Sequence, residues 1–237
     1  MTIKQNSKKM LRATISADVV SSTALSVEEL TLLQSEIRCF LDELSEKSQG
    51  KDWGRLFKGD SVEIFLSNPH EALRVALLLK SLVKKAFSCK KNKDAKRELF
   101  RKYGIRLAIG IGEMRIADQN QDVLDGEAIY CSGRLLESQK HTGNERIVIK
   151  RSMFFGSENS TFAEQMDVIL EFLDVLFKNA TSRQSEVVYY KLLGKQEKEI
   201  AELLNVRQHA VNQFSSSVGW NAIESAVNYF EKLNFES

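Results

Sequence analysis

Two aspartates at the ends of expected strands are the residues of this sequence best suited to chemistry. Asp18 ends an apolar strand that begins at Ala13, and Asp60 lies at the tip of an expected hairpin. Carboxylates on adjacent strand ends suit Mg²⁺, which prefers oxygen ligands and leaves coordination sites for substrate phosphates. Two metal ions held in this way would stabilise an in-line phosphoryl displacement. The spacing alone leaves a second interpretation open, in which both aspartates are ordinary turn residues.

Small hydroxyl residues directly follow the first aspartate. The loop Val20-Ser21-Ser22-Thr23 leads towards a helix start, where backbone amides favour anions. We therefore expect this loop to bind phosphate groups. A helix cap or a solvated turn is the competing interpretation of the same residues.

Apolar periodicity and turn residues predict the elements that would position these groups. In order they are a strand ending at Asp18, a helix from the Ser26 capping box to about Ser48, a hairpin over Trp53–Ser67, a helix beginning at Asn68-Pro69, a strand over Ile105–Gly112, a helix from Gly126 through Leu136, and an edge strand over Glu145–Lys150. This order is typical of an α+β, ferredoxin-like sandwich with helices on one sheet face. Gly110 and Gly112 indicate a close approach of backbone to the fifth element.

Two polar segments are expected to be loops. Lys84–Lys102 holds nine Lys or Arg against two acidic residues, which favours a solvated helix end and loop, although such a patch could also attract phosphates. Asp118–Asp125 is rich in Asp, Asn and Gln and is expected to be a polar loop.

The chain becomes purely helical from Glu164 onwards. We expect an α/β domain over 1–162, a linking helix over 163–180 and an all-α helix-turn-helix domain over 181–237. The last of these rests on the stretch Glu197–Phe214. Small or apolar residues occupy the packing positions of a helix-turn-helix, and Asn205 falls at its turn, where asparagine tolerates a left-handed backbone.

The second helix of this motif would expose a polar face. Its residues are Arg207, Gln208, His209, Asn212 and Gln213. Gln and Asn read adenine edges, and Arg reads guanine or phosphate. From Thr181 to the end, however, six Lys or Arg stand against seven Asp or Glu. A packing module without DNA therefore stays open, and any DNA affinity should be modest unless a dimer binds paired half-sites.

Composition favours an ordinary cytoplasmic protein. The formal charge is +2 and no apolar run is long enough for a membrane helix or a signal peptide core. Three isolated cysteines, Cys39, Cys89 and Cys131, are expected to be reduced thiols. Cys131 is expected to be a packed residue rather than a nucleophile, because no base is adjacent to it in sequence.

Four blocks appear in the order and approximate spacing of class III nucleotidyl cyclase domains, which the chain therefore resembles. They are Asp18–Thr23, Gly59-Asp60, Arg106–Glu113 and Gly126–Leu135. The resemblance implies that Asp18 and Asp60 bind metal ions. It also places Tyr130 and Arg134 where the family has an asparagine and an arginine that support the transition state, so Arg134 would be catalytic if the domain is active.

The chain departs from that family at the positions that read the base. Leu56 replaces a lysine and Val123 replaces its acidic partner. An aliphatic pair cannot reject a wrong base by leaving polar groups unpaired. Tyr130 in place of the asparagine removes a transition-state donor, so we expect weak or no cyclase activity.

The same blocks also resemble the SatD-like family of bacterial proteins, which in many cases join a divergent cyclase-like domain to a C-terminal helix-turn-helix. The stretch Thr181–Leu193 resembles the first helix of LuxR-type and sigma-factor region 4 domains. These resemblances imply the architecture more than an activity.

The leading hypothesis is a cytosolic transcriptional regulator or nucleotide-responsive sensor. Its partners would be a nucleotide with Mg²⁺ or Mn²⁺, DNA, and a second copy of the chain in a homodimer. The alternative is an active metal-dependent nucleotidyl cyclase or phosphotransfer enzyme, whose helical tail dimerises or recruits a partner. A structural adaptor is the third option.

Overall fold

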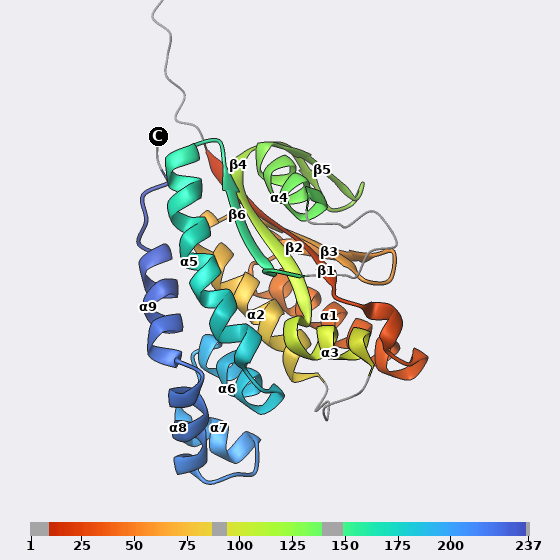
Figure 1. Cartoon of the computed structure of the whole chain (residues 1–237). Coiled ribbons are helices and arrows are strands. Elements are labelled where there is room, and N and C mark those ends of the chain that lie inside the picture. Colours follow the sequence, from red (N-terminus) through yellow and green to blue (C-terminus); the bar gives the residue numbers. More distant parts are fainter. Residues whose placement is uncertain (1–9, 87–93, 139–148, 236–237) are drawn as a thin grey trace, which may run out of the picture.

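The computed structural model describes residues 10–86, 94–138 and 149–235, which contain a six-stranded sheet (Figure 1). The strands are β1 Leu11–Val19, β2 Trp53–Phe57, β3 Ser61–Leu66, β4 Ile105–Asp118, β5 Val123–Gly126 and β6 Met153–Ser157. Their order is β2-β3-β1-β4-β5, with antiparallel neighbours throughout, and β6 pairs in parallel with β4. The fold is therefore a mixed α/β fold with a largely antiparallel sheet.

The helices connect the strands and then continue alone to the end. They are η1 Ser22–Ala24, α1 Val27–Lys47, η2 Pro69–Glu71, α2 Ala72–Lys85, α3 Ala95–Tyr103, α4 Glu127–Ser138, α5 Ser160–Asn179, α6 Ser182–Leu192, α7 Glu197–Leu203, α8 Gln208–Ser217 and α9 Trp220–Phe230. The expected capping box begins α1, since the Ser26 hydroxyl accepts from the Glu29 amide and the Glu29 carboxylate accepts from the Ser26 amide.

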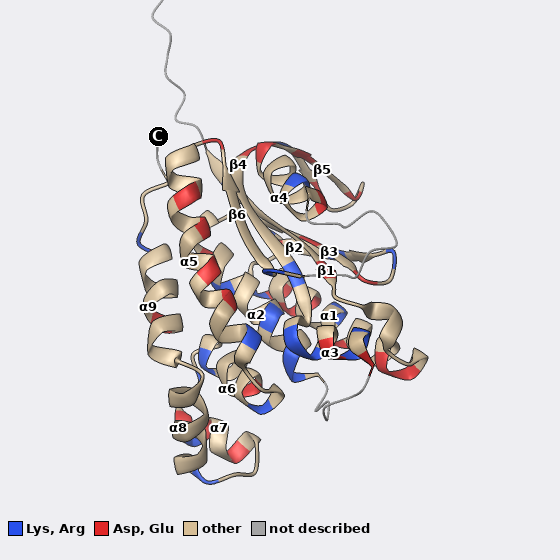
Figure 2. Cartoon of the chain, in the orientation of Figure 1, with Lys and Arg blue, Asp and Glu red and all other residues tan. Residues whose placement is uncertain are grey.

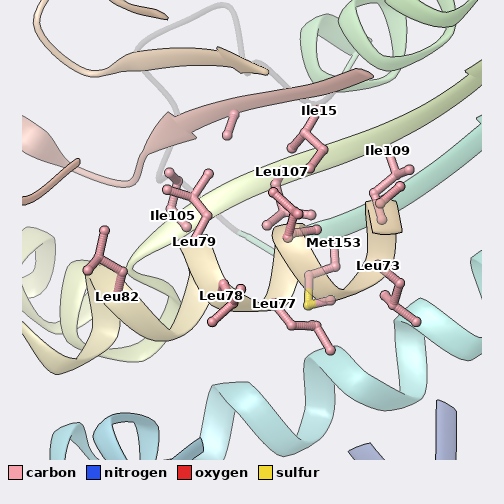
Figure 3. Packing of buried hydrophobic residues seen from close by; sticks show 14 of the residues in the cluster. Ile15, Leu73, Leu77, Leu78, Leu79, Leu82, Ile105, Leu107, Ile109 and Met153 are labelled. Carbon is pink, nitrogen blue, oxygen red and sulfur yellow. The ribbon is translucent and has the colours of Figure 1, made fainter. Parts of the chain in front are cut away.

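The main hydrophobic core lies between the sheet and the layer formed by α1, α2 and α5. Leucines along α2 contact Ile15, Ile105, Leu107 and Ile109 of the two central strands, as Figure 3 shows. Alternate residues of a strand point to opposite faces, so the intervening residues of β1 and β4 face the other way. These residues meet α4, which covers part of the second face. The expectation of helices on one face is therefore wrong for α4.

α4 approaches the sheet more closely than side chains would permit. A Cβ atom on Gly110 would lie 2.1 Å from the carbonyl oxygen of Ala128, and one on Gly112 would lie 2.8 Å from the Cβ of Glu127. The close approach predicted from these two glycines is confirmed. Beneath the helix, the hydroxyl of Ser132 is bonded to Thr14 at 2.9 Å and to Ser16 at 2.8 Å.

Most of the expected edge strand, residues 145–148, lies outside the described residues; Ile149 and Lys150 are not in a strand, and the last described strand is β6. The expected polar loop over Asp118–Asp125 is a β-hairpin, because β4 continues to Asp118 and pairs with Val123 of β5. Asp118–Asp125 contains only two apolar residues, Val123 and Leu124, so periodicity could not identify the strands there.

The expected solvated basic segment is partly buried. Residues 95–103 form α3, and Lys84 is 6% exposed and donates to the carbonyl oxygens of Lys102 at 2.8 Å and Arg101 at 3.4 Å. One turn earlier, Lys80 is fully buried. Its ammonium group donates to the carbonyl oxygens of Tyr103 and Ile105 and to the hydroxyl of Ser152, at 2.6 to 2.8 Å.

An acidic side chain completes this buried network. Asp174 of α5 lies 3.8 Å from the Lys80 ammonium group and accepts from the Ser152 amide at 2.8 Å. Burial lowers the pKa of Lys80 to about 8 and that of Lys84 to about 7, from an ordinary value of 10.5. The network ties α2, α3, β6 and α5 together.

The helical tail packs directly against the sheet-bearing part of the chain. Val188, Tyr189 and Leu192 of α6 belong to the main core, as do Trp220 and Phe230 of α9. The expected linking helix over 163–180 corresponds to α5, which packs against β6. A second, small cluster joins α6 to α7 and α8; its buried members are Val187, Ile200, Ala201 and Val211.

Within the described part of the chain, none of the helices has the length and apolar character needed to cross a lipid bilayer.

The contact between α4 and the sheet gives a first prediction. Gly110→Ala should lower the free energy of unfolding by about 1–3 kcal/mol, because the new methyl group must displace the backbone of α4. Urea unfolding followed by circular dichroism measures this change. Gly133→Ala in the same helix is the matched control, since a Cβ there meets nothing within 4 Å and alanine favours helices. Equal destabilisation by both variants would contradict the prediction.

The buried lysines give a second prediction, on pH. Their pKa values are lower in the folded than in the unfolded chain, so between the two values the unfolded chain binds more protons, and stability rises with pH. Each of the two lysines changes the free energy of unfolding by at most about 1.4 kcal/mol per pH unit. Between about pH 7 and pH 9, Lys84→Met should therefore flatten the rise in the free energy of unfolding. A slope equal to that of the unaltered protein would count against this account.

Candidate functional site

The predicted site residue Asp18 lies in a row of side chains that crosses four strands. The sheet register aligns Phe57 of β2 with Ser61 of β3, Ser61 with Asp18 of β1, and Asp18 with Arg106 of β4. Aligned residues point to the same face of a sheet. All four side chains therefore lie on the face that carries α4.

A pocket of about 380 Å³ opens beside this row, between α4 and the β2–β3 hairpin. From the strands it is lined by Ser16, Ala17, Asp18, Phe57, Lys58, Ser61, Val62 and Glu63. From α4 it is lined by Ile129, Tyr130, Gly133, Arg134, Leu136 and Glu137. Two of the predicted site residues, Asp18 and Arg134, thus face one cavity from opposite walls.

The carboxylate of Asp18 is held by the guanidinium group of Arg106. Nε of Arg106 donates to Oδ1 at 2.9 Å and Nη2 donates to Oδ2 at 2.7 Å. Both side chains are mostly buried, with 14% and 16% of their surface exposed. Bidentate pairs of this geometry are strong and directional, so Asp18 contributes a fixed, neutralised floor to the pocket.

Asp60 is adjacent to Asp18 in the sheet, but its carboxylate serves another contact. It lies in the turn next to Ser61, the residue paired with Asp18, which confirms the predicted placement on adjacent strand ends. Its Oδ2 accepts from the Ser22 hydroxyl at 2.8 Å, and its Oδ1 accepts from Ser61 at 3.4 Å. Asp60 does not line the pocket described above.

The predicted phosphate-binding loop, Val20 to Thr23, also lies outside the lining of that pocket. Ser21 has a left-handed backbone with φ of 52°, and η1 begins at Ser22. The amide of Val20 donates to the carbonyl oxygen of Gly104 at 2.9 Å. In this structure the loop holds the Asp60 turn, and its phosphate role stays a prediction.

The hydrogen bonds of Asp18 and Asp60 bear on whether these residues could hold the metal ion that the resemblance implies. Each oxygen of Asp18 and Asp60 accepts a hydrogen bond from a protein side chain. Among the described residues, no group of three or more His, Cys, Asp and Glu is arranged to hold a metal ion. A metal at Asp18 would have to displace a bidentate guanidinium, so the residues as arranged do not fit a resident Mg²⁺ or Mn²⁺.

Tyr130 is fixed in the wall of the pocket by its neighbours. Its hydroxyl donates to Asp125 and accepts from Arg115 at 2.9 Å. Arg115 and Arg134 place their guanidinium carbons 5.9 Å and 5.5 Å from the centre of its ring. The hydrogen bond from Tyr130 lowers the pKa of Asp125. A rigid aromatic wall therefore occupies the place where the resemblance implies an asparagine.

Arg55 joins two hairpins next to the pocket. Arg55 of β2 pairs with Glu63 at 2.6 Å and with Asp122, at the tip of the β4–β5 hairpin, at 2.9 Å. Glu63 lines the pocket, and it shares the positive charge of Arg55 with Asp122.

The positions that the resemblance assigns to base reading lie elsewhere. Leu56 packs against the main core, on the opposite face from Asp18. Val123 lies on β5 and is 36% exposed, and neither residue lines the pocket. Phe57 and Lys58 line it instead, and sequence reasoning missed both. The strand alternation around Trp53 would have placed Phe57 on this face.

Cys131 follows Tyr130 but faces the sheet rather than the pocket. Its thiol donates to a Glu127 oxygen at 3.4 Å, and burial raises its pKa to about 12. The thiol stays protonated at neutral pH, which agrees with the expected packing role. Among the described cysteines, Cys39 and Cys131 are free thiols, while Cys89 lies outside the described residues.

The second predicted site lies on α8. α7 and α8 are joined by a short turn in which Asn205 has φ of 50°, as expected from its tolerance of the left-handed region. Arg207, Gln208, His209, Asn212 and Gln213 are all exposed. Opposite them, Val211 is fully buried and Phe214 packs against the small cluster.

No model of a known protein family matches the chain, and no curated protein matches its sequence. Among solved structures, the chain is similar to two described as a bacterial light-regulated adenylyl cyclase, at 17% and 16% sequence identity and TM-scores of 0.40 and 0.39. Each match covers 62% of this chain, with 75% of the first cyclase chain and 43% of the second. The proposals below rest on the residues themselves.

The pair beneath the pocket gives a third prediction. Asp18→Asn and Arg106→Gln should each lower the free energy of unfolding, because each leaves a mostly buried charge without its partner. The double variant should lose less than the sum of the two, by about 1–2 kcal/mol. Urea unfolding of the four proteins measures this coupling. Additive losses would mean that the two charges do not depend on each other.

Proposed function

We propose that the chain is a nucleotide-responsive regulator that binds a nucleotide in the pocket beside α4 and binds DNA through α8. The observation that carries the first half is the pocket itself. It combines two aromatic side chains, Phe57 and Tyr130, with two cations, Lys58 and Arg134. Concave sites with aromatic walls and a few placed charges are typical of small-molecule binding.

Sensing is favoured over catalysis by the state of the acidic residues. A phosphoryl-transfer site needs groups that stabilise charge developing on the transferred phosphoryl group, usually through metal ions. Asp18 is held by a bidentate pair with Arg106, so it is not free for that role, and Asp60 does not line the pocket. Tyr130 is anchored to Asp125 and Arg115. These contacts support a site that holds a ligand without converting it.

The exposed polar face of α8 supports the DNA-binding half of the proposal. α8 carries no charged residue, and Arg207 lies at its N-cap. Lys and Arg gather instead around α3 (Figure 2). A single copy would therefore bind DNA weakly, because phosphate contacts supply most of the affinity. A homodimer that presents two copies of α8 to paired half-sites would overcome this weakness.

The two sites have a physical connection through α2. Arg74 of α2 donates to both carboxylate oxygens of Glu231, after α9, and to the carbonyl oxygen of Leu192 at the end of α6. α6 in turn packs against α7 and α8. A ligand that shifts the sheet against α2 would thereby move the helices that carry α8.

Binding is tested with the full chain and each common nucleotide, at neutral pH and with and without Mg²⁺. We expect at least one nucleotide to raise the unfolding temperature, because a ligand of the folded state stabilises it by mass action. Mass spectrometry of the same mixtures, and of mixtures with Mn²⁺, detects any nucleotide product and so tests the alternative hypothesis of an active enzyme. If a nucleotide is converted and Asp60→Ala abolishes the conversion, the chain is an enzyme and the proposed sensor is wrong. If no nucleotide raises the unfolding temperature, the proposed nucleotide binding is wrong.

DNA binding is tested by selecting genomic fragments with the purified protein. Arg207→Ala and Asn212→Ala should each weaken binding of the protein to the selected fragments by about tenfold, which is the effect of losing one good base contact. Lys198→Ala is the control, because Lys198 is exposed on α7 rather than α8. The mass of the protein–DNA complex, measured by light scattering, should correspond to two protein chains on one DNA fragment. If no fragment is enriched, the helical tail contacts proteins instead.

A further inference from the structure

The charges around the pocket beside α4 define how much negative charge a ligand could carry. Two of the lining acids already have cationic partners, Asp18 with Arg106 and Glu63 with Arg55. The other charged residues of the lining are Lys58, Arg134 and Glu137, the last on the exposed side of α4. Arg55 also pairs with Asp122, so the lining together with these partners carries a net charge of about zero, and the two lining cations leave room for only a small negative charge on a ligand.

Such a balance suits a single phosphate group. One phosphate group carries about one to two negative charges near neutral pH. A triphosphate carries several more, and proteins usually meet them with Mg²⁺ held by carboxylates. In this pocket Asp18 is the carboxylate best placed to hold such an ion, but its two oxygens accept hydrogen bonds from the Arg106 guanidinium group at 2.9 and 2.7 Å. The additional phosphates would meet acidic side chains without a bridging ion.

The two cations are each paired with an aromatic ring. The Lys58 ammonium group lies 5.9 Å from the centre of the Phe57 ring, and the Arg134 guanidinium carbon lies 5.5 Å from the centre of the Tyr130 ring. Arg55 and Arg115 lie 5.7 Å and 5.9 Å from the centres of the same two rings, so a base reaches a ring face when the cation over that face turns towards the phosphate group. Planar bases stack on such rings, and the contribution depends little on which base is bound.

We propose that this pocket binds a nucleotide with a single phosphate group, linear or cyclic, and that it does so without a divalent cation. Lys58 and Arg134 donate to the phosphate, and the base lies against Phe57 or Tyr130. The Asp18–Arg106 pair forms the floor and takes the place of a metal ion, since it leaves no bare carboxylate beneath the ligand. This inference rests on the proposed nucleotide sensing and specifies its ligand.

Titration calorimetry of the full chain tests the proposal. The probes are adenosine and guanosine monophosphates, their 3′,5′-cyclic forms and the two triphosphates, each with EDTA and with Mg²⁺. We expect one monophosphate form to bind in EDTA, with less than about a twofold change on adding Mg²⁺, and the triphosphates to bind at least about tenfold more weakly. The linear and cyclic probes identify the phosphate form.

Variants of the cations provide the second part of the test. Arg134→Gln and Lys58→Gln should each weaken monophosphate binding by about tenfold or more, as expected for a lost charge-assisted hydrogen bond. Arg38→Gln should change nothing, because Arg38 is exposed on α1, which covers the opposite face of the sheet. Circular dichroism of each variant checks that it folds.

The possible failures can be told apart. Tight binding of a triphosphate that requires Mg²⁺ would overturn the metal-free, single-phosphate proposal and leave nucleotide sensing intact. Binding of inorganic phosphate as tightly as a monophosphate would show that the aromatic walls do not recognise a base, which also overturns it. Absence of binding by every nucleotide would reject both this inference and the proposed function.

Discussion

The arrangement of the candidate site depends on how closely α4 lies against β4. Gly110 leaves room for the backbone of α4, which a methyl group would push away. This contact sets the height of the helix above the sheet, and the hydroxyl bonds of Ser132 to Thr14 and Ser16 fix its position along β1. Tyr130 and Arg134 project from the same helix, so the width of the pocket depends on the lack of a side chain at Gly110.

Local sequence signals predicted the elements with strong start and stop residues. The capping box at Ser26, the hairpin turn around Gly59 and the close approach at Gly110 are set by a few neighbouring residues. The placement of Asp18 and Asp60 on adjacent strand ends was also predicted, because both strands have clear boundaries.

Contacts between distant residues could not be predicted in the same way. The pair of Asp18 with Arg106 joins residues 88 positions apart and depends on the register of β1 against β4. Lys84 begins the basic segment expected to be solvated, and its burial, like that of Lys80, depends on where Lys102 and Tyr103 place their carbonyl groups. The state of the site, a paired rather than a free carboxylate, was thus hidden from the sequence.

The buried network at Lys80 has a consequence for the order in which the chain folds. Lys80 lies in α2, near the middle of the apolar face that β1 and β4 cover, but its partners Ser152 and Asp174 come some 70 and 90 residues later. A nascent chain that has completed only α2 cannot bury this ammonium group without a heavy desolvation penalty. The complete network around this ammonium group forms only when β6 and α5 lie beside α2 and β4, so the stability of the early elements depends on elements that come much later in the chain.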